Sequence, residues 1–258
     1  MIVQKETQKR SLRQQSIYLL PNLFTLSALF AGFYGVVQAM NGHFKIAAVA
    51  VFIAMILDGL DGRVARLTHS QSEFGAQLDS LSDMVSFGVA PALISYTWML
   101  HDFGKLGWSV AFIYCACAAL RLALFNTMIG TADKRWFIGI PSPTAAALVT
   151  GLVWISYDNK LVNFTYMPYV CLFITAFAGI SMVVQIKFWS FKEINIRRKV
   201  PFFGMLIVLA ALIALMWSPS FMLFGFFVLY SLSGYVLAAM HYLKKSPTPP
   251  SQDTDAAQ

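Results

Sequence analysis

Long runs of apolar residues, separated by short polar segments, are the feature that most limits the folds open to this sequence. A helix that crosses a bilayer needs about 20 mostly apolar residues. Of the 258 residues, 58% are hydrophobic and 12% are charged, whereas about 25% of a typical soluble domain is charged. We therefore predict an all-α, polytopic transmembrane helical bundle of about eight spans, and neither a disordered chain nor an ordinary soluble enzyme. The predicted spans are residues 20–40, 44–57, 84–100, 107–128, 144–156, 164–186, 200–217 and 221–242.

Two of these spans are short. The second, residues 44–57, is expected to continue as one helix through the polar residues 58–66. The fifth, residues 144–156, opens beside Pro141 and Pro143, and its length leaves open whether it crosses the bilayer completely. The first apolar run has about 20 residues, longer than the apolar region of about 7–15 residues in a signal peptide, so we interpret it as a retained span.

The basic residues fall unequally on the two sides of such a bundle. With the N-terminus inside, fifteen lysines and arginines lie on one side and Lys45, Lys105 and Lys160 on the other, while Arg121 falls within the fourth span. Cytoplasmic loops of membrane proteins carry an excess of Lys and Arg. We therefore predict an integral protein of a bacterial cytoplasmic (inner) membrane, with both termini on the cytoplasmic side. The net charge of +7 then reflects topology and attraction to anionic membrane lipids, and we expect no nucleic-acid partner.

Four aspartates, a third of the twelve acidic residues, lie within 26 residues at the junction of two predicted spans. They are Asp58, Asp61, Asp79 and Asp83. An acidic side chain at the centre of a membrane helix costs about 2.5–3.5 kcal/mol on insertion scales, and such residues usually mark a function. Four neighbouring carboxylates also repel one another, so a compensating partner is expected.

The spacing of these acids predicts a shared metal site. Asp61 lies three positions after Asp58, and Gly75, Asp79 and Asp83 follow one another at intervals of four positions, so each set lies on one face of a helix. Two neighbouring helices could then direct two carboxylates each at a common point. Two divalent cations would cancel the four negative charges. Ligands that are all oxygen favour Mg²⁺ or Mn²⁺ over Zn²⁺.

Small and basic residues accompany the acids. Gly62, Ala65 and Gly75 leave space for a ligand, although small residues in membrane helices also serve close packing. Arg66 supplies a planar, permanently charged group suited to a diphosphate. Arg63 has two interpretations, because it could bind the same group or anchor the helix at the membrane interface.

The complete pattern resembles the signature of the CDP-alcohol phosphatidyltransferase family, with each defining position filled. It reads Asp58-x2-Asp61-Gly62-x2-Ala65-Arg66-x8-Gly75-x3-Asp79-x3-Asp83. The resemblance implies a membrane enzyme that moves a phosphatidyl group from a CDP-lipid to an alcohol and releases CMP. It also implies a core of six transmembrane helices, often in a homodimer. Since eight spans are predicted, the last two would be additional.

Further segments resemble the phosphatidylserine synthase branch of this family, which implies CDP-diacylglycerol and L-serine as substrates. Arg121-Leu122-Ala123-Leu124-Phe125-Asn126 is similar to a branch segment that usually has Arg where Leu124 stands. The other similar segments are Leu20-Pro21-Asn22-Leu23-Phe24-Thr25, Phe87-Gly88-Val89-Ala90-Pro91 and Phe137-Ile138-Gly139-Ile140-Pro141-Ser142-Pro143. We expect a cytoplasmic segment (1–19), the family core (20–199), two added helices (200–243) and a disordered cytoplasmic tail (244–258).

The resemblance also assigns roles to the motif residues. Asp58, Asp61 and Asp79 would hold one metal ion. Asp58, Asp79 and Asp83 would hold the other. Asp83 is in addition the candidate base for the serine hydroxyl. The cytidine would be admitted by Gly62, Ala65 and Gly75, and the diphosphate would be held by Arg66.

The residues that bind the acceptor alcohol are predicted from the polar groups of the fourth span. Arg121 or Asn126 would line this site, since an arginine inside a membrane usually has a partner and a function. The alternative is that Arg121 pairs with the acidic cluster and fixes helix packing.

Two rival functions stay open at this point. The same reaction could use glycerol 3-phosphate or inositol phosphate, with Lys134 and Arg135 binding a second phosphate, or choline, held by aromatic residues. A divalent-cation transporter would also place carboxylates in a membrane. Against a transporter, the acids cluster at one membrane edge, and no paired inverted repeat is visible.

Overall fold

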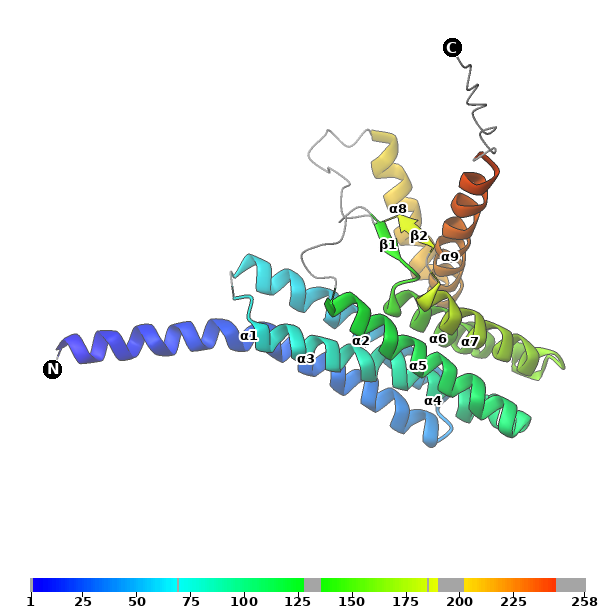
Figure 1. Cartoon of the computed structure of the whole chain (residues 1–258), viewed down its shortest axis with the longest axis horizontal. Helices are drawn as coiled ribbons and strands as arrows, with labels where there is room; N and C mark the ends of the chain where they lie inside the picture. Colours follow the sequence, from blue (N-terminus) through cyan, green and yellow to red (C-terminus); the bar gives the residue numbers. More distant parts are fainter. Residues whose placement is uncertain (1, 69, 128–135, 185, 190–201, 245–258) are drawn as a thin grey trace, which may run out of the picture.

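The computed structural model describes residues 2–68, 70–127, 136–184, 186–189 and 202–244. Within these ranges the predicted helical bundle is confirmed (Figure 1). The α-helices are α1 (Ile2–Met40), α2 (Phe44–Leu67), α3 (Glu73–Asp83), α4 (Ala90–Trp98), α5 (Lys105–Thr127), α6 (Ser142–Asp158), α7 (Met167–Val183), α8 (Phe202–Trp217) and α9 (Pro219–Lys244). A π-helix, η1 (Met84–Val89), and two 3₁₀ turns, η2 (Leu100–Phe103) and η3 (Leu161–Asn163), complete the described helical elements.

The described part of every predicted span is largely helical. Three described helices are long and apolar enough to cross a membrane, namely Leu20–Met40, Lys105–Thr127 and Pro219–Met240, and the shorter Met167–Val183 is also apolar. The second predicted span does continue through its polar half, because α2 ends only at Leu67. Together with the exposed apolar side chains described below, these helices make the chain an integral membrane protein.

Two short strands were not predicted. β1 (Trp136–Ile138) and β2 (Lys187–Trp189) pair in antiparallel register, with Phe137 opposite Phe188. The sixth predicted span was extended to residue 186, but α7 ends at Val183 and Val184 has an extended backbone. Pairing these segments satisfies backbone groups that lie beyond the helix ends. The predicted tail begins at Lys244, which is the last residue of α9, and its remaining residues lie outside the described ranges. The candidate phosphate ligands Lys134 and Arg135 also lie outside them.

Small side chains bring the helices of the core close together. α1 and α2 are neighbours through a turn at Gly42, whose φ is +77°. The C-terminal part of α1 packs beside α2, α3 and α4, while its N-terminal part projects from the bundle (Figure 1). Buried alanines, including Ala28, Ala47 and Ala146, form much of the core. A β-carbon at Gly32 would lie 2.5 Å from Ser86 Oγ. Close packing over small residues is the usual way membrane helices associate.

The transition from α3 to α4 has an identifiable cause. Pro91 has no N–H group, so the carbonyl of Phe87 has no donor one turn later in the chain. The fully buried Tyr114 of α5 donates its hydroxyl to this carbonyl at 2.9 Å. In η1 the N–H of Ala90 bonds the carbonyl of Val85, five residues earlier. This wider turn begins directly after Asp83, and π-helices of this kind are frequent at functional sites.

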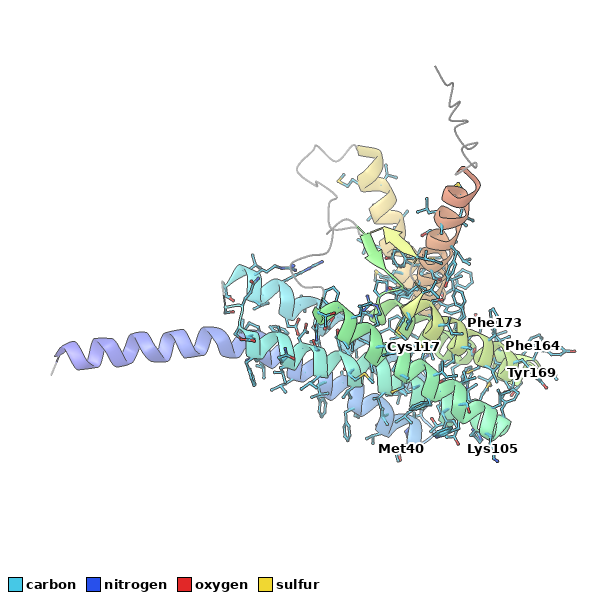
Figure 2. The ribbon with its side chains drawn as sticks, viewed as in Figure 1. Met40, Lys105, Cys117, Phe164, Tyr169 and Phe173 are labelled. Atoms are coloured by element: carbon cyan, nitrogen blue, oxygen red, sulfur yellow. The ribbon has the colours of Figure 1, made fainter. Side chains whose placement is uncertain are left out.

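Large apolar side chains cover the outside of the bundle. Figure 2 shows Phe164, Tyr169 and Phe173 at the end of the bundle where Met40 and Lys105 also lie. These three aromatic side chains are exposed. Amphipathic aromatic side chains are enriched where a membrane meets water. The exposed apolar surface is therefore the expected contact with lipid.

The two C-terminal helices stand at a steep angle to α1, α2 and α5 (Figure 1). α9 packs against α6 and contacts β2. Tyr235 of α9 forms a hydrogen bond of 2.5 Å with Ser181 of α7, and its ring lies 5.5 Å from that of Phe177. α9 is thus fastened to the other helices by polar as well as apolar contacts.

Candidate active site

The four aspartates of the motif are presented by two helices that meet beside α1. Asp58 and Asp61 lie in the second half of α2, and Asp79 and Asp83 lie on α3. α3 begins at this point because Ser72 caps it, accepting a hydrogen bond of 3.0 Å from the N–H of Gly75. Such a cap stabilises a helix start by about 0.5–2 kcal/mol relative to alanine.

The structure brings the carboxylates together as the spacing suggests. One carboxylate oxygen from each of Asp58, Asp61 and Asp79 lies within 4.8 Å of the others. Asp83 approaches the cluster through a carboxyl–carboxyl contact with Asp58, and it also interacts electrostatically with Asp79 and Asp61. The group therefore has a three-carboxylate centre with Asp83 at its edge.

Thr25 of α1 fixes one of these carboxylates. Its buried hydroxyl donates a hydrogen bond of 2.6 Å to Oδ2 of Asp61, which is itself only 5% exposed. The backbone carbonyl of Thr25 accepts a hydrogen bond of 3.0 Å from the hydroxyl of Ser82 on α3. One residue of α1 thus links α2 to α3. Sequence reasoning missed this role, although Thr25 lies in a segment that resembles the phosphatidylserine synthase branch.

Among the described residues, no basic side chain forms an ion pair with the aspartate cluster. Within the described ranges, Oδ1 of Asp79 and Oδ1 of Asp83 are buried without a hydrogen-bond partner. The ion pairs found there lie elsewhere, between Lys45 and Asp158 and between His101 and Asp102. Burial, followed by the charges of Asp58 and Asp61, raises the pKa of Asp79 to about 7. Asp79 lies on α3, before the apolar stretch that starts at residue 84.

These observations fit a divalent-cation site. The donors are all carboxylate oxygens, which Mg²⁺, Mn²⁺ and Ca²⁺ prefer. Buried carboxylate oxygens without a partner are costly, and a cation would satisfy them. The raised pKa of Asp79 reflects its burial and the neighbouring aspartate charges, and a bound cation would offset both effects.

A cavity of about 330 Å³ opens beside the aspartates. Its walls include the four motif positions predicted to bind the CDP-lipid, together with residues of α1 and of the loop before α3 that sequence reasoning did not single out. The lining residues are Pro21, Asn22, Thr25, Asp61, Gly62, Ala65, Arg66, Ser70, Gln71, Ser72, Gly75, Ala76 and Asp79. The exposed Arg63 is not among them, which favours the interpretation of Arg63 as an interfacial anchor.

The two glycines of the motif meet different surroundings. A β-carbon at Gly75 would lie 3.1 Å from Ser72 Oγ and 3.3 Å from Asn22 Oδ1, so a larger side chain here would displace its neighbours. A β-carbon at Gly62 would meet nothing within 4 Å. Gly62 therefore leaves open space at the cavity wall, whereas Gly75 permits close packing of α3 beside α1.

Neither Arg121 nor Asn126 is among the residues that line the cavity. Arg121 donates a hydrogen bond of 2.8 Å from a terminal nitrogen to Ser142 Oγ and interacts electrostatically with Asp83. Asn126 donates a hydrogen bond of 3.0 Å to Ser80 Oγ on α3. Both residues thus contact the acidic region without touching the cavity, and their predicted role in binding the acceptor stays a prediction.

The comparison with protein families decides the relationship of the chain. The family model for CDP-alcohol phosphatidyltransferase matches residues 18–186, which contain the acidic cluster and the cavity. The chain belongs to this family. The resemblance found in the motif is therefore confirmed, together with a match that extends over most of the helical bundle.

Curated relatives give the same picture. A CDP-diacylglycerol–serine O-phosphatidyltransferase of Helicobacter pylori is 42% identical over 181 residues, which cover 69% of this chain and 75% of that protein. The enzyme of that name from Bacillus subtilis is 31% identical over 174 residues, covering 67% of this chain and 92% of its own length. A CDP-diacylglycerol–serine O-phosphatidyltransferase of Mycobacterium leprae is 36% identical over 180 residues, which cover 68% of this chain and 59% of that protein.

Proposed function

We propose that this protein transfers the phosphatidyl group of CDP-diacylglycerol to the hydroxyl of L-serine, producing phosphatidylserine and CMP. The observation that carries the proposal is the aspartate cluster at the wall of a 330 Å³ cavity that also presents Arg66 and Gly75. Family membership supports the reaction type. The names of the relatives from H. pylori and B. subtilis support serine as the acceptor.

The cavity is the proposed site of the CDP-lipid head group. Arg66 holds the diphosphate, because a guanidinium presents paired N–H donors to phosphate oxygens. Gly62 and Ala65 keep one wall free of bulky side chains, so the cytidine can lie against α2. The cavity volume lies at the lower end of the range of about 300–1,000 Å³ that is usual for small-molecule sites.

The aspartates supply oxygen ligands for two divalent cations, proposed to be Mg²⁺ or Mn²⁺. Asp58, Asp61 and Asp79 would hold one ion, and Asp58, Asp79 and Asp83 would hold the other. Bound there, the ions would neutralise the diphosphate and stabilise the charge that develops on the departing CMP. Thr25 keeps Asp61 oriented for this role through its hydrogen bond.

Asp83 is the proposed general base. The serine oxygen forms a bond to the phosphorus that bears the lipid, the bond from this phosphorus to the CMP oxygen breaks, and Asp83 takes the hydroxyl proton. Asp83 suits this role because its Oδ1 has no hydrogen-bond partner among the described residues. Arg121, which interacts with Asp83, is the proposed contact for the carboxylate of serine, and Asn126 lies on the same helix.

The proposed setting is a bacterial cytoplasmic membrane, with both termini and the active site on the cytoplasmic side. The distribution of basic residues supports this orientation. Surrounding lipids contact the apolar exterior, and a homodimer is proposed by analogy with the family. The residues following 199 are proposed as two helices added to a six-helix core.

One assay tests the reaction and the acceptor. Purified protein in detergent is incubated with CDP-diacylglycerol and Mn²⁺ or Mg²⁺, and CMP release is compared for L-serine, glycerol 3-phosphate, inositol phosphate and choline. We expect release with L-serine alone, and its loss in Asp83→Asn, which still binds the CDP-lipid. Release with glycerol 3-phosphate alone would contradict the acceptor, and full activity of Asp83→Asn would contradict its role as base. A cation transporter is not favoured, since the chain belongs to a transferase family.

A further inference from the structure

A side chain of α9 reaches the proposed acceptor end of the active site, although α9 lies beyond the part of the chain that the family model matches. That match ends at residue 186, whereas α9 spans Pro219–Lys244. Tyr230, near the middle of α9, is close enough to Arg121 for an electrostatic interaction between the two side chains. A helix beyond the matched core therefore contributes a neighbour to Arg121, a partly buried cation near Asp83.

The surroundings of Arg121 come from three different elements. Ser142, at the start of α6, accepts a hydrogen bond of 2.8 Å from one terminal nitrogen and is only 1% exposed. Asp83, at the end of α3, attracts the positive charge, and Tyr230 approaches from α9. The guanidinium is thus hydrogen-bonded to α6 and lies near an acidic side chain of α3 and a tyrosine of α9. The hydrogen bond limits the orientations open to this planar group.

One donor of this guanidinium remains available. The Nε of Arg121 is buried, and no group among the described residues accepts a hydrogen bond from it. A buried donor without an acceptor is costly, and a bound carboxylate would satisfy it. Arginine commonly binds a carboxylate through two parallel N–H groups along one edge. Ser142 and Tyr230 would then determine which edge of Arg121 is presented.

α9 is held firmly enough for this purpose. Five residues after Tyr230, the hydroxyl of Tyr235 bonds Ser181 at 2.5 Å, and the ring of Tyr235 packs on Phe177. Gly151 of α6 lies against Phe224 of α9, where a β-carbon would come within 3.1 Å of the ring. The close contact between α6 and α9 keeps Ser142 and Tyr230 on the same structural unit.

We propose that α9 completes the acceptor site, with Tyr230 as a positioning residue that, with Ser142, orients Arg121 toward the carboxylate of an amino-acid acceptor. This inference rests on the proposed function and deepens it. It assigns to α9 a part in acceptor selection, since the cavity proposed for the CDP-lipid is lined by α1, α2, α3 and the loop before α3.

The test is a comparison of Michaelis constants in the full chain. Tyr230→Phe removes one hydroxyl and keeps the ring. We expect the KM for L-serine to rise about tenfold, in line with loss of an interaction with a charged group, while the KM for CDP-diacylglycerol is unchanged. Tyr169→Phe is the control, because it removes a hydroxyl from an exposed tyrosine of α7 that packs against Phe103, and its serine KM should stay at the wild-type value.

A double-mutant cycle adds a second measurement. If Tyr230 acts through Arg121, then Tyr230→Phe should have little further effect on serine KM in an Arg121→Lys background. An unchanged serine KM in Tyr230→Phe, an equal rise for both substrates, or full additivity with Arg121→Lys would overturn the inference. If the unmodified protein released no CMP with serine, the proposed function would fail and this inference with it. If instead the enzyme is active with serine and Tyr230→Phe gives one of the three contradicting results above, only the role of Tyr230 is overturned and the proposed function stands.

Discussion

Replacing Thr25 by valine removes one hydroxyl from the active site while keeping the shape of the side chain. That hydroxyl donates to Oδ2 of Asp61 at 2.6 Å, and both residues are buried. The backbone carbonyl of Thr25, which accepts from Ser82, is untouched by the change. The substitution therefore tests the side-chain hydrogen bond and leaves the link between α1 and α3 in place.

The magnitude follows from the kind of bond. A hydrogen bond to a charged group contributes about 1.5–3 kcal/mol, and each 1.4 kcal/mol corresponds to a factor of about ten. Loss of a residue that orients a metal ligand typically lowers metal affinity or activity about 10–100-fold. We therefore expect Thr25→Val to raise the half-saturating concentration of Mn²⁺ or Mg²⁺ by about 10–100-fold.

The assay is CMP release measured against metal concentration, with direct Mn²⁺ binding to the detergent-solubilised protein as a readout independent of turnover. Thr25→Ser is the control, because it retains the hydroxyl and should remain within a few-fold of wild type. Equal metal dependence in wild type and Thr25→Val would refute the idea that Thr25 orients Asp61 as a metal ligand. A matching defect in Thr25→Ser, which keeps the hydroxyl, would also count against this hydrogen bond as the cause.

Three further outcomes are expected. In metal-free protein the pKa of Asp79 is about 7 in the folded state, against an ordinary value of 3.8. Because the folded state then binds more protons than the unfolded state, thermal stability should fall as the pH rises from 5 to 7 and then level off. Asp79→Asn should flatten this profile, and an unchanged slope in the variant would contradict the prediction. Gly75→Val should cost about 1–3 kcal/mol through overpacking, because a β-carbon at this position would lie 3.3 Å from Asn22 Oδ1. The displaced cavity wall should weaken CDP-lipid binding. Wild-type affinity in a binding titration would argue against the cavity as the lipid head-group site. Tyr114→Phe should lower the free energy of unfolding by about 1–3 kcal/mol, because the buried Phe87 carbonyl loses its hydrogen-bond donor. An unfolding midpoint equal to that of wild type would contradict the proposed role of this hydrogen bond.

The helices and the acidic cluster could be predicted from sequence because both depend on local periodicity. Asp58 and Asp61 share a face of one helix, and Asp79 and Asp83 share a face of another. The approach of these two faces was the one feature of the cluster that helical periodicity did not specify. The length of each apolar run likewise indicated where the membrane helices form. These features are set by residues within a few turns of one another.

Contacts between distant segments were beyond that reasoning. Thr25 lies 36 residues from Asp61, and nothing in either helical pattern points to the other. The pairing of β1 with β2 joins segments about 50 residues apart. The approach of Tyr230 to Arg121 depends on how α9 packs on α6, which helical periodicity does not specify. Ser72 is the exception, because a serine before Glu73 is a local signal for a helix start that could have been recognised.

The π-helix after Asp83 makes the length of this segment as important as its composition. An α-helix turns by about 100° per residue, so removing one residue between Met84 and Val89 would turn the face that carries Asp79 and Asp83 away from α2 unless α4 rotated instead. α4 is fixed in the core by Pro91 and Ile94, both buried. The chain therefore tolerates exchange of side chains in η1 more readily than any insertion or deletion. Gaps in this stretch should be rare among working relatives, even where the residues themselves differ.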